Sequence, residues 1–170
     1  MEYTMRLRPY KREDGTFLCR WLTDRRMLGM WCRENFSYPL TQDQLDVYYQ
    51  DMENDPYCFG FTALNDHGIP VGSFRMSRAD YEKRSVHLGL IVVDPSLRGQ
   101  GIGEQMVSLA ARYGKEFLQM DRITLNVFDC NPVAKRCYEK AGFQAEQFKE
   151  DDFVFDEEQW GNYLMVYRAE

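Results

Sequence analysis

The chain has 170 residues, of which 44% are hydrophobic and 28% are charged, and its formal net charge at pH 7 is −6. This composition excludes an intrinsically disordered chain, and the length favours a single domain over residues 1–170 with a full hydrophobic core. The acidic balance argues against nonspecific binding to nucleic acid, which requires a basic surface.

The first half of the chain predicts three strands and two helices. Apolar side chains at helical spacing indicate the helices, and Thr41 is expected to cap the second of them. The segment Asn65-Asp66-His67-Gly68 has the chemistry of a tight turn, so the strands on either side of it should form a hairpin. The expected strands cover residues 3–8, 57–64 and 69–76, and the expected helices cover 11–22 and 41–52.

The second half predicts four strands and two helices. The strand over 86–93 ends in a run of apolar residues, so we expect it to be buried on both faces. Further strands are expected over 122–128, 143–149 and 163–168, and helices over 103–120 and 132–140. The element order predicts an α+β (α/β-type) single domain with a mixed, mostly antiparallel central sheet of about six or seven strands and flanking helices.

Cysteine usage and apolar runs bear on metals and on the compartment. The five cysteines are far apart with no CxxC pair, and there are only two histidines. We therefore expect no metal site, and we expect reduced thiols in a cytoplasmic protein. No stretch approaches the roughly 20 apolar residues of a membrane helix, and the first residues lack the apolar run of a secretory signal, so no membrane partner is expected.

The strongest chemical signal is a glycine-rich loop between a strand and a long helix. It consists of Arg98, Gly99, Gln100, Gly101, Ile102 and Gly103, with three glycines in five residues. Glycine has no Cβ, so its N–H group can approach a ligand closely, and a helix that follows adds unpaired N–H groups and the positive end of its dipole. Together these features predict a pyrophosphate site.

Two common nucleotide motifs do not fit this loop. A P-loop requires Lys-Ser/Thr after its last glycine, whereas Glu104-Gln105 follows Gly103 here. A dinucleotide fingerprint requires GxGxxG, and the spacing here is GxGxG. The remaining alternative is a glycine-rich turn that starts a helix without binding a phosphate.

The loop also matches a family pattern. Arg98-x-x-Gly101-x-Gly103 after an apolar strand resembles motif A of the GNAT superfamily of acyl-CoA N-acyltransferases. Downstream, the segment Leu125-x-Val127-x-x-x-Asn131-x-x-Ala134-x-x-x-Tyr138-x-x-x-Gly142-Phe143 is similar to the next motif of that superfamily. The resemblance covers residues 71–143. Its nearest branch includes ribosomal-protein N-terminal acetyltransferases and polyamine acetyltransferases.

The resemblance implies a GNAT-like fold, acetyl-CoA as co-substrate and a set of binding residues. The pantetheine arm would pair with the backbone of the strand before the loop, at Ile91, Val92 and Val93. The same backbone N–H groups would polarise the thioester carbonyl. Asn131 would bond a pantetheine amide, although it is also a natural helix cap. The alternative for Ile91 to Val93 is an ordinary core strand. Both can hold, because the backbone contacts the ligand while the side chains pack.

The catalytic roles follow from the same resemblance. Tyr138 would protonate the departing thiolate, because a phenol with a pKa near 10 carries its proton at neutral pH. The alternative for Tyr138 is a tyrosine packed on the inner face of a helix. Many family members carry a glutamate base in the fourth strand, which this chain lacks, and His87 lies close to that position. Glu82, a water chain, or a purely structural His87 are the alternatives.

The acceptor is expected to be a small-molecule amine or a protein or peptide N-terminus, attacked directly in a ternary complex. Two segments, 23–40 and 150–158, should flank the acceptor, although the acidic run in the second is also typical of a solvated surface. Four aromatic residues are candidates for the pocket or for the core: Trp21, Trp31, Phe36 and Tyr38. The resemblance also implies a homodimer. The alternative function is a non-catalytic acyl-CoA-binding sensor or scaffold, which the missing strand glutamate favours.

Overall fold

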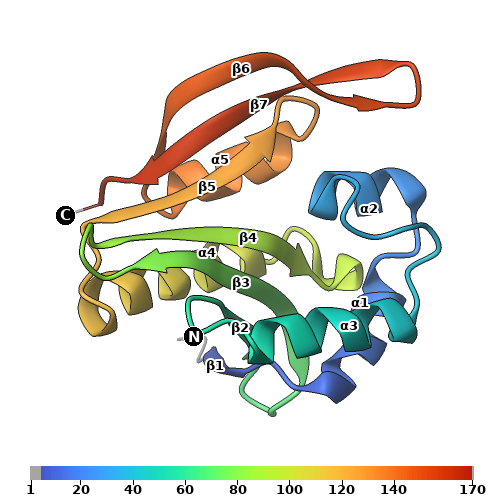
Figure 1. Cartoon of the computed structure of the whole chain (residues 1–170), viewed down its shortest axis with the longest axis horizontal. Helices are drawn as coiled ribbons and strands as arrows, with labels where there is room; N and C mark the ends of the chain where they lie inside the picture. The colour runs from blue at the N-terminus through green and yellow to red at the C-terminus, as the bar shows by residue number, and fades with distance from the viewer. Residues whose placement is uncertain (1–4, 170) are drawn as a thin grey trace. The chain divides into compact units, whose positions relative to one another are not determined.

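The computed structural model describes residues 5–169 and contains seven strands and five α-helices. In chain order these are β1 (Arg6–Pro9), α1 (Gly15–Trp21), α2 (Arg25–Cys32), α3 (Gln42–Glu53), β2 (Phe59–Leu64), β3 (Pro70–Asp80), β4 (Ser85–Val93), α4 (Ile102–Arg112), β5 (Arg122–Phe128), α5 (Pro132–Lys140), β6 (Phe143–Phe155) and β7 (Glu158–Tyr167) (Figure 1). No helix among the described residues is long and apolar enough to cross a membrane.

The strands form one mixed sheet in the order β1-β2-β3-β4-β5-β7-β6. The pair β4–β5 is parallel, and the pairs β1–β2, β2–β3, β5–β7 and β6–β7 are antiparallel. The predicted fold class, a mixed and mostly antiparallel sheet with flanking helices, is therefore confirmed. The expected strand over 3–8 begins in residues that lie outside the described part of the chain, and its described portion is β1.

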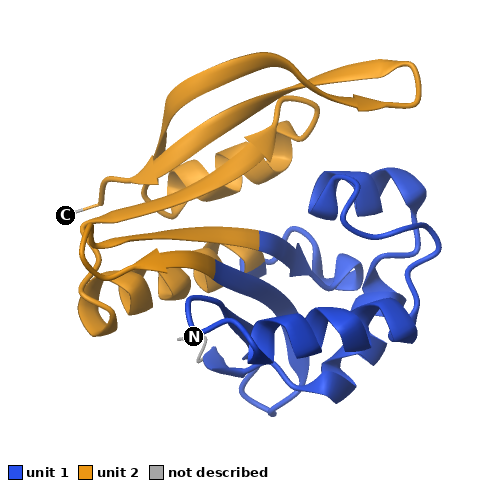
Figure 2. Ribbon diagram, viewed as in Figure 1, with its two compact units in different colours: residues 1–76, 90–102 blue, residues 77–89, 103–170 orange. Residues whose placement is uncertain are grey.

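Contacts between residues divide the chain into two compact units (Figure 2). The first unit contains the residues up to Met76 together with Leu90–Ile102, and the second contains Ser77–Gly89 and the residues from Gly103 onward. Strands β3 and β4 each contribute to both units. The expectation of a single domain over 1–170 stays a prediction.

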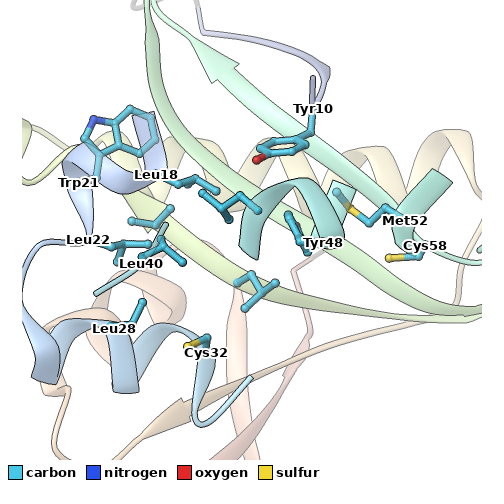
Figure 3. Close-up of a cluster of buried hydrophobic side chains, with 13 residues drawn as sticks. Tyr10, Leu18, Trp21, Leu22, Leu28, Cys32, Leu40, Tyr48, Met52 and Cys58 are labelled. Atoms are coloured by element: carbon cyan, nitrogen blue, oxygen red, sulfur yellow. The ribbon is translucent and has the colours of Figure 1, made fainter. Parts of the chain in front are cut away.

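The first unit is built on an apolar cluster that α1, α2 and α3 share with Leu90 and Val92 of β4 (Figure 3). The predicted cap of α3 is confirmed, because the Thr41 hydroxyl accepts a hydrogen bond from the Gln44 N–H at 3.3 Å. Trp21 is 4% exposed and belongs to this core. Trp31 and Phe36 pack against it with stacked rings, whereas Tyr38 is 49% exposed.

Helix α2 is an element that the sequence analysis missed, since residues 23–40 were expected to be a connection between helices. Asp24 caps it: its side chain accepts hydrogen bonds from the N–H groups of Arg26 and Met27 at 2.8 and 3.0 Å. Aspartate before a short amphipathic run is a recognisable start signal. The helix therefore had a local signature, although its eight residues give only about two turns of pattern.

The expectation that β4 is buried on both faces is wrong. Val86, Leu88, Leu90 and Val92 are buried, and the residues between them are half-buried. The apolar run at the end of the strand concealed an ordinary alternation of period 2, in which one face packs on apolar residues. The strand also has an irregular residue, Leu90, whose φ of 48° lies in the left-handed region.

The second unit contains a long helix that ends earlier than expected. Helix α4 stops at Arg112, and the chain continues as a π-helix over Tyr113–Phe117 instead of an α-helix to Met120. Gly114 lies in this turn, where an added Cβ would come within 3.0 Å of Ile123 on β5. Glycine thus permits a close approach of the helical segment to the sheet. Helix α5 contacts β5 and β6, and its predicted bounds are confirmed.

The β6–β7 hairpin replaces the loop that was expected over 150–158. The strands were predicted to end at Lys149 and resume at Tyr163, but pairing extends to Phe155 opposite Glu158 (Figure 1). Aromatic side chains explain the extension. Phe155 stacks on Trp160 with ring centroids 4.8 Å apart, and such pairs stabilise a two-stranded ribbon. The acidic residues between the aromatics obscured the strand pattern.

Candidate active site

The glycine-rich loop is open in the way that a pyrophosphate requires. Gly99 and Gly101 have φ values of 79° and 76°, and an added Cβ at either position would meet no atom within 4 Å. Both residues are exposed. Left-handed glycines turn backbone N–H groups toward a common point, and α4 begins directly after them. The residues present therefore fit the pyrophosphate of coenzyme A.

One side chain of the loop packs into the protein, and the others face solvent. Ile102 is 3% exposed and packs inward, whereas Arg98 and Gln100 are exposed. The Nη2 atom of Arg98 lies 3.2 Å from the thioether sulfur of Met27 on α2. A thioether is a weak acceptor, so this contact orients the guanidinium without neutralising it. Arg98 can thus supply a positive charge beside the loop.

The end of β4 leads into this loop within the same unit. The side chain of Val92 is buried in the core, whereas Ile91 and Val93 are half-buried. Within this unit β3 is the strand neighbour of Leu90–Val93. The register of β4 with β5 ends at Leu88 opposite Leu125, so the second edge of Leu90–Val93 is available to a partner such as an extended pantetheine chain.

His87 lies in the second unit, on the half-buried face of β4. Its Nδ1 atom is 2.8 Å from the hydroxyl of Thr124, and its Nε2 atom is 3.4 Å from the amide nitrogen of Asn126. Both partners come from β5, two residues apart, so their side chains share one face of the sheet. If the Asn126 amide donates, the neutral ring carries its proton on Nδ1, and the Nε2 lone pair accepts that 3.4 Å contact. The ring can then act as a base where an acceptor ammonium or a water replaces the Asn126 amide at Nε2.

Asn131 and Tyr138 are placed by α5 in the second unit. The Oδ1 atom of Asn131 accepts the N–H of Ala134 at 3.3 Å, and Pro132 occupies the first helical position. The helix-cap role of Asn131 is therefore present, and its amide nitrogen remains available to donate to a ligand.

Tyr138 is 8% exposed on the inner side of α5. Burial, with a smaller contribution from Cys137, raises the pKa of Tyr138 well above its ordinary value near 10. The phenol therefore keeps its proton throughout the neutral range. A phenol that is protonated at neutral pH can donate a hydrogen bond to a departing thiolate and then transfer its proton to it.

The alternative base Glu82 is far less constrained by its surroundings than His87. Glu82 lies in the exposed turn between β3 and β4, where its N–H bonds the carboxylate of Asp80 at 3.1 Å. Within residues 5–169 no three His, Cys, Asp or Glu side chains are grouped so that they could hold a metal ion. The expected site residues divide between the units: Ile91 to Ile102 belong to the first, and His87, Gly103, Asn131 and Tyr138 to the second.

Sequence reasoning missed three polar residues that the structure brings forward. Thr124 and Asn126 could have been found, because they follow Arg122 at i+2 and i+4 and so mark the polar face of an alternating strand. Arg75 stands between the buried side chains of Phe74 and Met76 on β3 and lines a cavity of about 500 Å³ in the first unit. The cavity is lined by Asn35, Phe36, Gln44, Val47, Tyr48, Asp51, Met52, Asp55, Cys58, Arg75 and Leu90.

Comparison with known proteins identifies relatives along nearly the whole chain. The spermidine N(1)-acetyltransferase of Vibrio cholerae is 24% identical over 168 residues, which cover 99% of this chain and 92% of that protein. The peptidyl-lysine N-acetyltransferase YjaB of Escherichia coli is 28% identical over 132 residues, which cover 74% of this chain and 79% of that protein.

A solved structure shows the same fold. The crystal structure of spermidine N-acetyltransferase from Vibrio cholerae in complex with CoA and spermine aligns with a TM-score of 0.83 at 22% identity, covering 95% of this chain and 94% of that chain. The family model of the Acetyltransferase (GNAT) family matches residues 25–143, which include both sequence motifs and α2. The chain therefore belongs to the GNAT family, and it is an N-acetyltransferase that takes the acetyl group of acetyl-CoA and transfers it to an amine.

Proposed function

We propose that the chain acetylates a primary amine by direct attack on the thioester while acetyl-CoA and acceptor are bound together. The observation that carries the proposal is the open loop at Gly99 and Gly101, since left-handed glycines with free space beside them are what a pyrophosphate requires. When bound there, acetyl-CoA supplies an activated acetyl group. No covalent acyl-enzyme is needed.

The chain's own groups would hold the co-substrate at three places. The loop N–H groups and the Arg98 guanidinium bind the pyrophosphate, and the free edge of Ile91–Val93 pairs with the pantetheine arm. The amide nitrogen of Asn131 donates to a pantetheine carbonyl while its oxygen caps α5. A backbone N–H of β4 polarises the thioester carbonyl.

Two side chains would move protons. His87 removes a proton from the acceptor ammonium, directly or through one water, with the Nε2 lone pair once the weak 3.4 Å contact with the Asn126 amide is released, and Thr124 holds the ring by its other nitrogen. Tyr138 donates its proton to the leaving thiolate. One group is then a base and the other an acid. The nitrogen loses two protons in becoming an amide: His87 takes the first before attack, and the second, lost from the nitrogen as the tetrahedral intermediate collapses, restores the Tyr138 phenol that has protonated the thiolate, so that one proton is released overall.

The acceptor class is supported by the relatives. They are described as acting on spermidine and on peptidyl-lysine, and both acceptors present a primary amine on an alkyl chain. We propose an amine of that reactivity for this chain. Such an amine is largely protonated at neutral pH, which is why a base is needed.

The test is a calorimetric titration of the purified chain with acetyl-CoA, with desulfo-CoA and ATP for comparison. We expect both CoA compounds to bind, ATP not to bind, and Gly101→Ala to weaken CoA binding. Gly68→Ala is the matched control, because Gly68 has the same φ of 76° in the β2–β3 turn and nothing nearer than 3.9 Å to an added Cβ. Equal CoA affinity in both variants would contradict the proposed loop role.

Turnover is then measured as release of CoA thiol in the presence of an amine panel. Steady release with at least one primary amine is expected. A chain that binds acetyl-CoA but releases no thiol with any amine would be a sensor instead of an enzyme, and would overturn the proposal.

A further inference from the structure

Arg75 is a charged residue for which the described structure offers little compensation. Its Nε atom is buried and has no hydrogen-bond partner, and the guanidinium lies 5.9 Å from the centre of the Tyr48 ring. Across residues 5–169 Arg75 makes no ion pair with an acidic side chain. A buried, unpaired donor of a charged group costs stability, so such a residue requires a reason.

Arg75 lines the 500 Å³ cavity described above, beside buried Tyr48 and Cys58. Burial raises the pKa of Cys58, while the positive charge of Arg75 opposes that rise and the negative charge of Asp55 adds to it. The volume lies in the range of small-molecule sites. A guanidinium with a free donor edge is suited to a planar carboxylate, which it can bind through two parallel hydrogen bonds.

One wall of the cavity is formed by β4, the strand proposed to hold acetyl-CoA. Leu90 lines the cavity, and Leu90 is followed directly by Ile91, the first of the backbone positions proposed to pair with the pantetheine arm. A molecule in the cavity can therefore present an amine toward β4 while another group contacts Arg75 on β3.

We propose that the cavity is the acceptor site and that Arg75 binds a carboxylate of the acceptor, so that the preferred substrate is an amine bearing a carboxylate, such as a free amino acid. This rests on the proposed function, because it names the acceptor class of the same reaction. Asp51 and Asp55 lie at the exposed rim of the cavity and would attract the ammonium group of such a zwitterion.

The proposal separates this chain from its polyamine-acetylating relatives. A polyamine has no carboxylate to accept the buried N–H of Arg75, so in a polyamine complex that donor would stay unpaired. A site that hydrogen-bonds one group of its substrate rejects analogues that lack the group, because its own polar atoms are then left unpaired.

The experiment compares each of several amino acids with its α-amide, and with spermidine and spermine, by CoA thiol release. The amide lacks the carboxylate charge, and its less basic amine is neutral to a larger extent near pH 7, so a preference for the acid does not arise from a larger supply of free amine. We expect kcat/KM for the best acid to exceed that of its amide by about tenfold or more.

Arg75→Gln tests the residue directly. We expect it to raise KM for the acid by about tenfold or more, to leave the amide nearly unchanged, and to leave acetyl-CoA affinity intact. Arg75→Lys keeps the positive charge but loses the paired N–H donors of the guanidinium, so its KM for the acid should lie between those of the unmodified chain and Arg75→Gln. The matched control is Arg78→Gln, an exposed arginine on the same strand that does not line the cavity, which should change nothing.

Folding stability provides an independent measurement. A purely structural Arg75 would lose stability on replacement, whereas an arginine kept for a ligand should not. We expect Arg75→Met to unfold at a temperature equal to or above that of the unmodified chain, since it removes an unpaired buried donor. A clear fall in the midpoint would count against the proposal.

The outcomes distinguish this proposal from the proposed function. Turnover that favours amides or polyamines, or an Arg75→Gln variant that lowers kcat for all acceptors alike, overturns the carboxylate site while acetyl transfer stands. If no amine is acetylated, acetyl transfer fails, and the site is tested by calorimetric titration of the amino acids into the CoA-saturated chain. Binding that Arg75→Gln abolishes would retain the site, and absence of binding would overturn it.

Discussion

The Nδ1 atom of His87 lies 2.8 Å from the hydroxyl oxygen of Thr124, its neighbour across the parallel β4–β5 pair. One nitrogen of the imidazole is thus fixed by the sheet itself, and the other faces the amide of Asn126. Rigid strands hold a base in place better than a loop would, since the ring orientation follows from the register of two strands.

His87→Gln should lower kcat/KM by about 10²-fold or more at neutral pH, because a positioned base contributes about that much. The loss should shrink as the pH approaches the pKa of the acceptor ammonium, about 10 for an alkyl amine, because the amine then loses its proton to the solvent without a base. Initial rates across pH measure both effects. A loss of the same size at every pH would leave His87 with a structural role.

Thr124→Val should reproduce part of that loss, because it releases the imidazole without removing it. Thr124→Ser keeps the hydroxyl and should retain nearly full activity. The difference between the two variants measures how much the Thr124 hydroxyl contributes to positioning the His87 ring. It is measured as kcat/KM against pH in the same buffer series. A serine variant as slow as the valine variant would show that packing of the methyl group, not the hydroxyl, is what matters.

Tyr138→Phe should reduce kcat by about 10²-fold or more while acetyl-CoA affinity changes little. The pKa of Tyr138 is raised by burial, so its ionisation should produce no fall in activity below about pH 10. Tyr81→Phe is the control, since Tyr81 is 51% exposed and lies outside the site. An unchanged turnover in Tyr138→Phe would remove the phenol from the reaction.

Asn131 allows its two roles to be separated. Aspartate is as good a helix cap as asparagine but has no amide donor, so Asn131→Asp should keep stability and weaken acetyl-CoA binding. Asn131→Ala should lose both, with a stability cost of about 1 kcal/mol. Thermal unfolding and calorimetry measure the two quantities. Full CoA affinity in Asn131→Asp would mean that the residue only caps α5.

Local signals explain why much of the fold was predictable. Thr41, Pro132 and the Asn65–Gly68 turn act on their immediate neighbours, so their elements appeared where expected. The glycine loop was found for the same reason. Its chemistry lies in the backbone conformation of successive residues, which the sequence of glycines indicates directly.

Tertiary interactions explain the errors. Leu90 adopts a left-handed conformation although Gly89 beside it could do so at less cost, because the surrounding packing outweighs local preference. The paired part of β6 extends to Phe155 because aromatic side chains such as Phe155 stack on partners in β7. The cavity around Arg75 gathers residues from α3, β3 and β4, and such an assembly has no signature in any single segment.

Asp14, which immediately precedes α1, connects β1 and β2 of the first unit through its carboxylate. Its carboxylate accepts two hydrogen bonds from Arg8 of β1, at 2.7 and 2.9 Å, and one from the Thr62 hydroxyl of β2 at 2.7 Å. Burial tends to raise the pKa of Asp14, but the bonds from Arg8, the Lys11 N–H and Thr62 outweigh it, so that the pKa is lowered. The charged form is therefore the stabilising one.

Asp14→Asn should cost about 3 kcal/mol at neutral pH, since it leaves a half-buried Arg8 without its partner. Because the folded pKa is depressed, the stability that Asp14 provides is present above its unfolded pKa near 4 and is lost as the pH falls through the folded value. The difference between the two proteins should thus be constant above about pH 5 and shrink below pH 4. Urea unfolding at several pH values measures it. Asp46→Asn, which breaks the exposed pair with Arg12, should cost much less; equal losses in the two variants would show that burial of the Asp14 network contributes nothing.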